Sequence, residues 1–307
     1  MEKVIVVIGP TSVGKTKMGV ALAKKFNGEV ISGDSMQIYK QMDIGTAKVT
    51  EEEKEGIIHH CVDILNSDET YSVHDFQQTV RKKITEITQR GHVPIIVGGT
   101  GLYIKAALYD YQFDEMENDH HAINEKYKDY TNEQLHDHLK SIDEESAKIL
   151  HFNNRRRVLR AIEIYETTGK RKSEMLEEQE HICLYDAYFV GLTLPRDVLY
   201  ERINKRVDVM MENGLKEEME RLYSQGLTRN HQSMKAIGYK EWFDYYDHQI
   251  DLNDVLELIK KHSRQYAKRQ YTWFKNQFDV HWYDVNLENF EQTIEQVTDD
   301  IEKILKV

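Results

Sequence analysis

The chain has 307 residues, of which 31% are charged and 40% are hydrophobic, and its formal net charge is −12 at pH 7. A chain of this length can bury one large core with a second lobe, and no apolar stretch approaches the roughly 18 residues that span a bilayer. Cys61 and Cys183 lie far apart without C-x-x-C spacing, which argues against a disulfide framework or a thiolate zinc site. We expect a cytoplasmic protein with no membrane partner and no obligate protein partner.

The first predicted elements are a strand at residues 4–8 and a helix at residues 15–26, joined by a G-x-x-x-x-G-K-T loop. In such a loop the backbone amides and the helix N-terminus face anionic oxygens, the lysine adds positive charge, and the threonine hydroxyl joins the coordination of Mg2+. A plain turn from strand to helix is the weaker interpretation, because strand, loop, lysine and helix occur in the required order. The predicted phosphate-binding residues are Gly9, Pro10, Thr11, Ser12, Val13, Gly14, Lys15 and Thr16, with Thr16 as the predicted Mg2+ ligand.

Further strands are predicted at residues 29–32, 93–97, 188–194 and 280–283, with amphipathic helices between most of them. This alternation predicts an α/β fold with a parallel sheet flanked by helices, similar to the phosphate-loop (P-loop) NTPases. Strand signals disappear between about residues 113 and 185, where helical patterns dominate. We therefore expect a discontinuous core formed by residues 1–113 and 186–307, with a long helix over residues 254–274, and an inserted all-helical lobe over residues 114–185.

Two short segments follow predicted strands at the sheet edge where α/β proteins bind ligands. Asp34 follows the second strand, and its carboxylate can serve as a general base or an outer Mg2+ ligand, or can simply cap a turn. Thr100 lies in a glycine-rich segment, residues 98–101, that permits close backbone approach to a ligand, with a plain turn as the alternative. The strand before it ends in glycine and not in the metal-binding aspartate of many phosphate-loop NTPases, which weakens an ATPase interpretation.

Basic residues are grouped along the chain despite the negative net charge. They gather at residues 155–160, 170–172 and 260–275, whereas acidic residues crowd residues 51–55, 110–119 and the C-terminal helix. One basic run alone is as consistent with a solvated helix face as with a binding patch. Three runs together favour an anionic polymer as partner.

Residues 9–16, 34–39, 42–48 and 98–103 together resemble the motifs of the tRNA dimethylallyltransferase family. The resemblance continues in the family's order at residues 59–64, 153–161, 237–241 and 264–274, so it extends over most of the chain. Ser12-Val13 stands where many family members carry Ala-Ser, and Asn154 replaces a commoner aspartate. Neither departure removes a group that the chemistry needs.

The resemblance implies transfer of a dimethylallyl group from dimethylallyl diphosphate to the exocyclic amine, N6, of the adenosine on the 3′ side of a tRNA anticodon. The phosphate loop then holds a leaving group, diphosphate. Because the adenine amine is a weak nucleophile, the reaction needs a nearby base and charge stabilisation at the diphosphate. Asp34 is the candidate base, Thr100 is expected near the bridging oxygen of the breaking bond, and Lys15 with the loop amides is expected at the outer oxygens.

The resemblance also assigns partners to several cationic residues. Arg202 and Arg206 are expected to complete the diphosphate site, with a surface ion-pair face towards Glu201 or Asp208 as the alternative. An adenine must leave the stack of the anticodon stem-loop to reach an enclosed carboxylate. Gln37 offers a donor and an acceptor to the base, although a glutamine satisfied by backbone is the alternative. The predicted tRNA-binding residues are Asp34, Ser35, Met36, Gln37, Thr100, Arg157, Arg160, Arg264, Lys268 and Arg269.

Two other classes of protein remain open from the residues themselves. A small-molecule kinase would bind ATP at the same loop and use Asp34 as base towards an alcohol. A non-catalytic, nucleotide-dependent RNA-binding protein would keep the basic runs and tolerate loss of Asp34. We set aside a metal site at residues 59–61, since adjacent residues do not readily face one ion, and we assign Trp273 and Phe274 to core packing in preference to base stacking.

Overall fold

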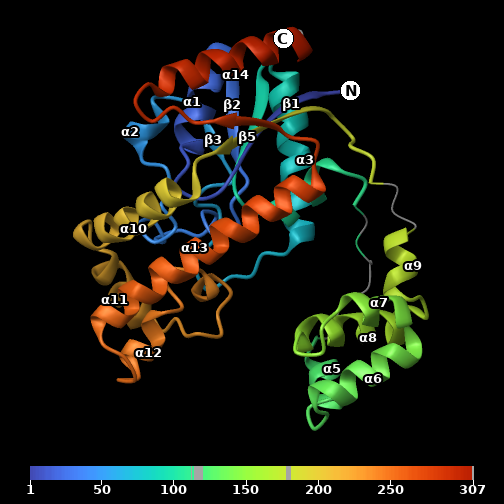
Figure 1. Ribbon diagram of the computed structural model, residues 1–307. Helices are drawn as coiled ribbons and strands as arrows, with labels where there is room; N and C mark the ends of the chain where they lie inside the picture. The colour runs from blue at the N-terminus through green and yellow to red at the C-terminus, as the bar shows by residue number, and fades with distance from the viewer. Residues whose placement is uncertain (112, 114–119, 178–180, 306–307) are drawn as a thin grey trace. The chain divides into compact units, whose positions relative to one another are not determined.

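The computed structural model describes all residues except 112, 114–119, 178–180 and 306–307 (Figure 1). The chain divides into two compact units, Met1–Tyr109 with Cys183–Val307, and Asp110–Ile182. The chain leaves and re-enters the larger unit at adjacent points, since Tyr109 and Cys183 form an antiparallel bridge. The smaller unit is therefore an insertion in the sequence of the larger one. The expected boundary at residue 114 lies outside the described residues.

The larger unit contains one sheet of six parallel strands in the order β3-β2-β4-β1-β5-β6. The α/β class and the parallel sheet are confirmed, and five of the strands were predicted from the sequence. The two-residue β3 was not, because two histidines carry no strand pattern. The strands are β1 (Lys3–Ile8), β2 (Gly28–Ser32), β3 (His59–His60), β4 (Val93–Val97), β5 (Asp186–Thr193) and β6 (His281–Asp284).

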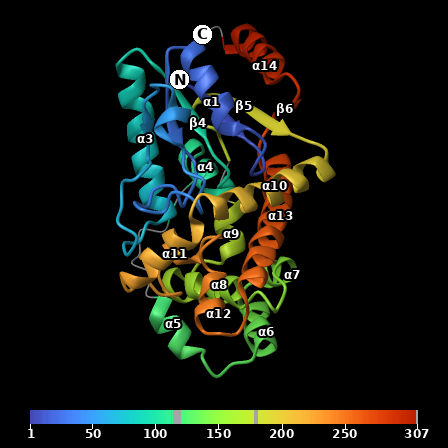
Figure 2. The same cartoon turned by 90° about the vertical axis from the view of Figure 1, so that its left-hand side faces the viewer.

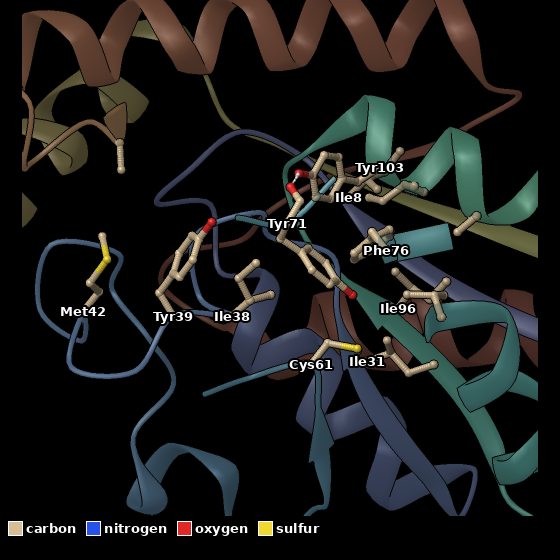
Figure 3. Packing of buried hydrophobic residues seen from close by; sticks show 14 of the residues in the cluster. Ile8, Ile31, Ile38, Tyr39, Met42, Cys61, Tyr71, Phe76, Ile96 and Tyr103 are labelled. Carbon is tan, nitrogen blue, oxygen red and sulfur yellow. Dashed lines mark hydrogen bonds between the residues drawn. The ribbon is translucent and has the colours of Figure 1, made fainter. Parts of the chain in front are cut away.

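Helices cover both faces of this sheet (Figures 1 and 2). On one face, α1 (Lys15–Lys25) and α14 (Phe290–Leu305) pack over Ile5 and Val7 of β1. On the other, α3 (Val73–Gln89) and α4 (Gly101–Leu108) pack over Val4, Val6 and Ile8, and Figure 3 shows Ile8 and neighbouring side chains of this core. Burial on both faces explains why the strands read as continuous apolar runs without a polar alternation.

The C-terminal half of the larger unit adds a group of helices beside the sheet. The predicted helix at residues 254–274 is present as α13 (Leu252–Gln277), which begins at the capping box formed by Asp251 and Asp254. It packs against α4 and α10. No helix among the described residues is long and apolar enough to cross a bilayer. The remaining elements of this unit are α2 (Glu51–Lys54), α10 (Arg196–Glu212), α11 (Leu215–Ser224), η1 (Ser233–Lys235) and α12 (Trp242–Tyr246).

The smaller unit has a core of its own, and its described residues form helices without strands. Leu135 and Leu139 of one helix pack with Val158 and Ile162 of another, and all four side chains are fully buried. The inserted helical lobe expected from the loss of strand signals is confirmed as part of the fold class. Its helices are α5 (His120–Lys126), α6 (Asn132–Ile142), α7 (Glu144–Ile149), α8 (Arg155–Thr168) and α9 (Lys172–Glu177).

A buried carboxylate ties β2 to its surroundings. Glu29 of β2 is 2% exposed, and its two oxygens accept hydrogen bonds from Arg90 Nε and Nη2 at 3.1 and 2.7 Å. His60 Nε2 of β3 lies 2.6 Å from the same carboxylate. Burial alone would raise the pKa of Glu29, but the hydrogen bonds from Arg90 and His60 outweigh it and hold the pKa below its usual range.

Replacement of Glu29 with Gln is expected to lower the free energy of unfolding by about 2 kcal/mol at pH 7, because charge-assisted hydrogen bonds are lost. The folded-state pKa of Glu29 is lower than the unfolded one, so its contribution is present above the unfolded pKa and is lost as the pH falls through the folded pKa. Urea unfolding should therefore show the gap between wild type and Glu29→Gln closing below a pH of about 4. The exposed Glu52→Gln is the control, and a gap independent of pH would contradict this account.

Candidate active site

Three loops meet at the carboxyl ends of adjacent strands. The phosphate loop follows β1, Asp34 follows β2, and the glycine-rich segment follows β4, which lies between the other two strands. Gly33 N donates to Val97 O at 2.8 Å, and Thr100 N donates to Gly33 O at 3.2 Å. A Cβ atom on Gly98 would lie 2.3 Å from the Gly33 carbonyl carbon, so only glycine permits this contact. The structure thus brings together the three segments that the sequence singled out.

The phosphate loop is fixed in the conformation of an anion-binding turn. Gly9 and Gly14 have φ values of +147° and +102°, and α1 begins directly after Gly14. Ser12 also has a positive φ, +67°, and its buried hydroxyl has no hydrogen-bond partner in the described part of the chain. Lys15 Nζ donates to Pro10 O at 2.7 Å. The loop therefore presents amides, a hydroxyl and an amine that an anionic ligand can engage.

Two arginines of α10 reach the phosphate loop. Arg202 Nε donates to Ser12 O at 3.0 Å, and Arg206 Nη1 donates to Thr11 Oγ1 at 3.4 Å. Asp208, the alternative partner considered for these arginines, pairs instead with Lys260 at 2.8 Å. Both arginines therefore contact the phosphate loop, Arg206 from a half-buried position and Arg202 from an exposed one, and their role in binding diphosphate stays a prediction.

Beside the phosphate loop, the basic side chains Lys15 and Arg206 outnumber the one carboxylate, Asp34. Burial lowers the pKa of Lys15 to about 7, helped by the charge of Arg206 and opposed by that of Asp34. Burial also lowers the pKa of Arg206, whose guanidinium nevertheless stays charged. Protein atoms surround these three side chains, yet each keeps some exposed surface, as groups beside a cavity do. One carboxylate does not balance two cations, so the site favours a further anion.

Asp34 and Thr100 are held side by side by the backbone of residues 35 and 36. Asp34 Oδ1 accepts from Met36 N at 2.9 Å, while Thr100 Oγ1 accepts from Ser35 N at 3.1 Å and lies 3.3 Å from Ser35 Oγ. Burial raises the pKa of Asp34, although the Met36 amide and the charge of Lys15 act in the opposite direction. A carboxylate with a raised pKa is a better proton acceptor near neutral pH than an exposed one.

A cavity of about 320 Å³ opens beside Asp34 in the larger unit. Part of its wall is apolar and comes from α10 and α13, including Ile203, Val207 and Ile259, while Lys235 and Lys240 also line it. Of the predicted site residues, those lining the cavity are Thr11, Ser12, Asp34, Ser35, Met36, Arg206 and Arg269. The cavity therefore has polar groups beside the phosphate loop and an apolar part of its wall that can contact a hydrocarbon group.

Two residues of α13 complete the site, and residue-type reasoning gave them no role. Gln270 Oε1 accepts from Thr11 N at 3.0 Å, and its Nε2 donates to Gly99 O at 2.9 Å. Tyr266 OH donates to the same carbonyl at 3.3 Å. A Cβ atom on Gly99 would lie 2.1 Å from Gln270 Nε2, which explains the glycine. The available signals were the i, i+4 spacing of Tyr266 and Gln270 on a predicted helix and their place within the family-like segment of residues 264–274.

The residues predicted to bind tRNA are not all gathered at this cavity. Arg264 donates to Asn204 of α10, Lys268 is exposed, and Arg269 lies 5.8 Å from the centre of the Tyr266 ring. Arg157 and Arg160 belong to the smaller unit; Arg157 is exposed, and Arg160 Nη1 pairs with buried Glu163 at 2.8 Å. The three α13 residues and the two α8 residues thus lie on separate units.

For Gln37 and for the α13 pair Trp273 and Phe274, the sequence allowed either a contact with a base or a structural role. Gln37 Nε2 lies 3.4 and 3.3 Å from the carbonyl oxygens of residues 46 and 47, and its Oε1 accepts from Ser32 Oγ at 3.1 Å. The Gln37 amide nitrogen is therefore satisfied by backbone, and its oxygen keeps one further lone pair for a base contact. Phe274 is fully buried and Trp273 packs 5.4 Å from the Phe278 ring, so the core-packing interpretation of this pair is confirmed.

The chain offers oxygen ligands suited to Mg2+. Thr16 lies in the first turn of α1, and its hydroxyl has no hydrogen-bond partner within the described ranges. Within the same ranges, no cluster of three acidic, histidine or cysteine side chains could hold a metal by itself. The Thr16 hydroxyl and the Asp34 carboxylate, which interacts electrostatically with the neighbouring Lys15, are oxygen groups of the kind that bind Mg2+ together with substrate phosphates.

This fold and site define a phosphate-loop α/β enzyme whose cavity is lined by phosphate-loop residues, a carboxylate and apolar side chains. The family model described as IPP transferase matches residues 37–277. tRNA dimethylallyltransferases of Bacillus cereus (strain AH187) and Bacillus anthracis are each 54% identical over 287 residues, covering 92% of this chain and 90% and 91% of theirs. The chain belongs to the IPP transferase family and to its prenyl-transferring class of enzymes.

Solved structures agree with this assignment. The crystal structure of tRNA delta(2)-isopentenylpyrophosphate transferase from Staphylococcus epidermidis is 47% identical, with a TM-score of 0.74, and covers 99% of both chains. A eukaryotic dimethylallyltransferase acting on tRNA is 33% identical, with a TM-score of 0.86, over 99% of this chain and 79% of that one. The resemblance predicted from the sequence is confirmed, and the kinase and non-catalytic alternatives are not supported.

Replacement of Lys15 with Met is expected to raise the free energy of unfolding by about 1–3 kcal/mol at pH 7 without ligand, because it removes an enclosed charge. The folded pKa of Lys15, about 7, lies below its ordinary value of 10.5. Between these two pH values the unfolded chain therefore binds more protons than the folded one. The free energy of unfolding of wild type contains a contribution that rises with pH in this range, and Lys15→Met lacks that contribution. Urea unfolding at several pH values measures the difference.

The exposed Lys17→Met serves as control for that experiment. Pyrophosphate with Mg2+ should stabilise wild type and Lys17→Met and leave Lys15→Met almost unchanged, since only a ligand that binds the folded state shifts unfolding. A Lys15→Met protein that is less stable than wild type at pH 7 would contradict the account of an uncompensated cation.

Proposed function

We propose that the chain transfers the dimethylallyl group of dimethylallyl diphosphate to N6 of the adenosine 3′ to a tRNA anticodon, and releases diphosphate. The observation that carries the proposal is the excess of enclosed positive charge at the phosphate loop, next to a carboxylate and an apolar wall. Such a site suits an anionic leaving group joined to a small hydrocarbon. The identity to tRNA dimethylallyltransferases supports tRNA as the acceptor.

The donor is held by its diphosphate. The loop amides, Lys15, Arg202 and Arg206 bind the oxygens, and the unpartnered Ser12 hydroxyl gains an acceptor. The bound anion raises the pKa of Lys15, so the amine is fully charged when the leaving group departs. The Thr16 hydroxyl and the Asp34 carboxylate would hold Mg2+, which would supply positive charge to the diphosphate oxygens when bound.

The acceptor is activated by Asp34. As the bond between N6 and the allylic carbon forms, the bond from that carbon to the bridging diphosphate oxygen breaks, and one N6 proton passes to an Asp34 carboxylate oxygen. Thr100 lies next to Asp34 through Ser35, and its hydroxyl donates towards the bridging oxygen as negative charge develops there. The raised pKa of Asp34 matches this demand for a base.

The apolar wall keeps the reactive carbon away from water. Ile203, Val207 and Ile259 lie in the cavity wall beside Arg206 and are each at most 2% exposed, so they pack behind its surface, which the partly exposed Met36 and Met210 extend. The dimethylallyl chain lies against this apolar part of the wall. Because an allylic cation-like centre reacts with any nearby water, this dry surface favours transfer to N6 over hydrolysis.

Basic residues on each unit bind tRNA phosphates. In the smaller unit, Lys172 has a lowered pKa, caused first by burial and then by the charges of Arg157 and Arg160. These three cations therefore lie close together and form a phosphate-binding cluster. In the larger unit, Arg264, Lys268 and Arg269 of α13 bind the strand that leads the adenosine towards the cavity.

Asp34→Asn is expected to lower kcat for transfer by about 10²–10⁴, the usual contribution of a positioned base. Binding of dimethylallyl diphosphate should remain within a few-fold of wild type, because the anion site is retained. The measurement is label transfer from dimethylallyl diphosphate to unmodified tRNA, with calorimetry for donor binding and the exposed Asp68→Asn as control. ATP turnover without RNA, or normal transfer by Asp34→Asn, would overturn the proposal.

Arg157→Ala is expected to weaken tRNA binding and to reduce the slope of log K against log salt concentration by about 0.7–0.9, the value of one phosphate contact. The KM for dimethylallyl diphosphate should not change. Arg171→Ala is a matched control in the same unit, since Arg171 is already paired with Glu174. Equal salt slopes for wild type and Arg157→Ala would remove Arg157 from the tRNA interface.

A further inference from the structure

Two stretches of the cavity wall come from segments that the reaction described above does not use. One is the loop containing Gly45, Thr46 and Ala47, and the other contains Ile237 and Gly238. The two segments are far apart in the sequence, and neither carries a group that acts on the donor. Their backbones must nonetheless be held in place, because both shape the space beside Asp34.

A single buried carboxylate binds both segments. Glu218 of α11 is 2% exposed, and its Oε2 accepts from Asp43 N and Ile44 N, each at 2.9 Å. Its Oε1 accepts from Gly45 N at 3.1 Å and from Tyr239 OH at 2.6 Å. Three consecutive backbone amides thus converge on one side chain, which is how a protein binds an anion tightly.

The two segments also touch each other directly. A Cβ atom on Gly45 would lie 2.5 Å from the Tyr239 ring, and one on Gly238 would lie 3.3 Å from Gly45 O. Gly238 has a φ of +96°, and its amide donates to Glu241 Oε2 at 2.9 Å. The two segments are therefore packed in direct contact, and Glu218, which is bonded to residues on both, holds them together as one part of the cavity wall.

The clamped loop in turn orients Gln37. The carbonyl oxygens of Thr46 and Ala47 receive the Gln37 side-chain amide, and Gln37 follows the segment of residues 34–36 that lines the cavity. At the far end of the loop, buried Lys48 pairs with Asp43 and Asp63 at 2.6 Å each. Glu218 and Lys48 therefore fix the loop from its two ends.

We propose that Glu218 is a positioning residue for the acceptor: it holds residues 45–47 and 236–238 together as the part of the cavity wall that the adenine base contacts. This inference rests on the proposed function. Within the described residues, the hydrogen bonds of Glu218 go to the loop and to Tyr239, and none goes to the phosphate loop, Arg202 or Arg206. Loss of Glu218 should therefore harm acceptor binding and spare donor binding.

Glu218→Gln tests this directly, because its amide nitrogen faces donors and cannot accept their hydrogen bonds. We expect kcat/KM for tRNA to fall about 10–100-fold, as loss of hydrogen bonds to a charged group implies. The KM for dimethylallyl diphosphate and the Kd for pyrophosphate should stay within about twofold of wild type. Exposed Glu217→Gln on the same helix is the control, and Tyr239→Phe, which removes one of four bonds, should have the same pattern with a smaller effect.

The following outcomes would contradict the positioning role of Glu218 or the proposed function. If tRNA and donor parameters fall together in folded Glu218→Gln, or neither changes, the positioning role is wrong. If Glu218→Gln does not fold, Tyr239→Phe answers the question, and unchanged tRNA kinetics in that variant overturn the role. Wild type that transfers no prenyl group to tRNA would instead overturn the proposed function, whatever the variants do.

Discussion

The constraint on which the active site depends is the uncompensated positive charge at the phosphate loop. Lys15 and Arg206 are enclosed by protein and face one carboxylate, Asp34, so the ligand-free site disfavours the charged form of Lys15 and lowers its pKa to about 7. The sheet and its helices keep these groups from moving apart into solvent. Arg202 and Arg206 of α10 are held against the phosphate loop. The hydrophobic cores on both faces of the sheet offset the loss of folding stability that the buried charges cause.

The order of the strands places the groups for both substrates at one edge of the sheet. Because β4 lies between β1 and β2, the loops that follow them share one edge, and Asp34 and Thr100 lie beside the anion site. The long helix α13 then closes the arrangement: Gln270 links Thr11 of the phosphate loop to Gly99 of the neighbouring loop. The same helix presents Arg269 at the cavity and Lys268 on its exposed surface. Donor and acceptor groups are therefore organised by a common set of elements.

The sequence predicted those parts of the molecule that depend on local pattern. Five strands are short apolar runs, α13 and the inserted helices have apolar periodicity, and the phosphate loop has a fixed spacing, so each could be identified from residues near one another. Gln270, Tyr266 and Glu218 could not, because their partners lie 171, 167 and about 175 residues away in the chain. Gln37 shows the same limit: its residue type allowed a base contact or backbone satisfaction, and only the fold places Thr46 and Ala47 beside it.

The charges of Lys15 and Asp34 act on each other across the site. The charge of Lys15 lowers the pKa of Asp34, and the charge of Asp34 raises the pKa of Lys15. Burial acts the other way on both groups and has the larger effect on each, so it raises the pKa of Asp34 and lowers that of Lys15 to about 7. The two groups are therefore coupled, and a ligand anion that changes the protonation of one changes the pKa of the other. In the proposed mechanism, donor binding at the phosphate loop and proton acceptance by Asp34 are linked for this reason.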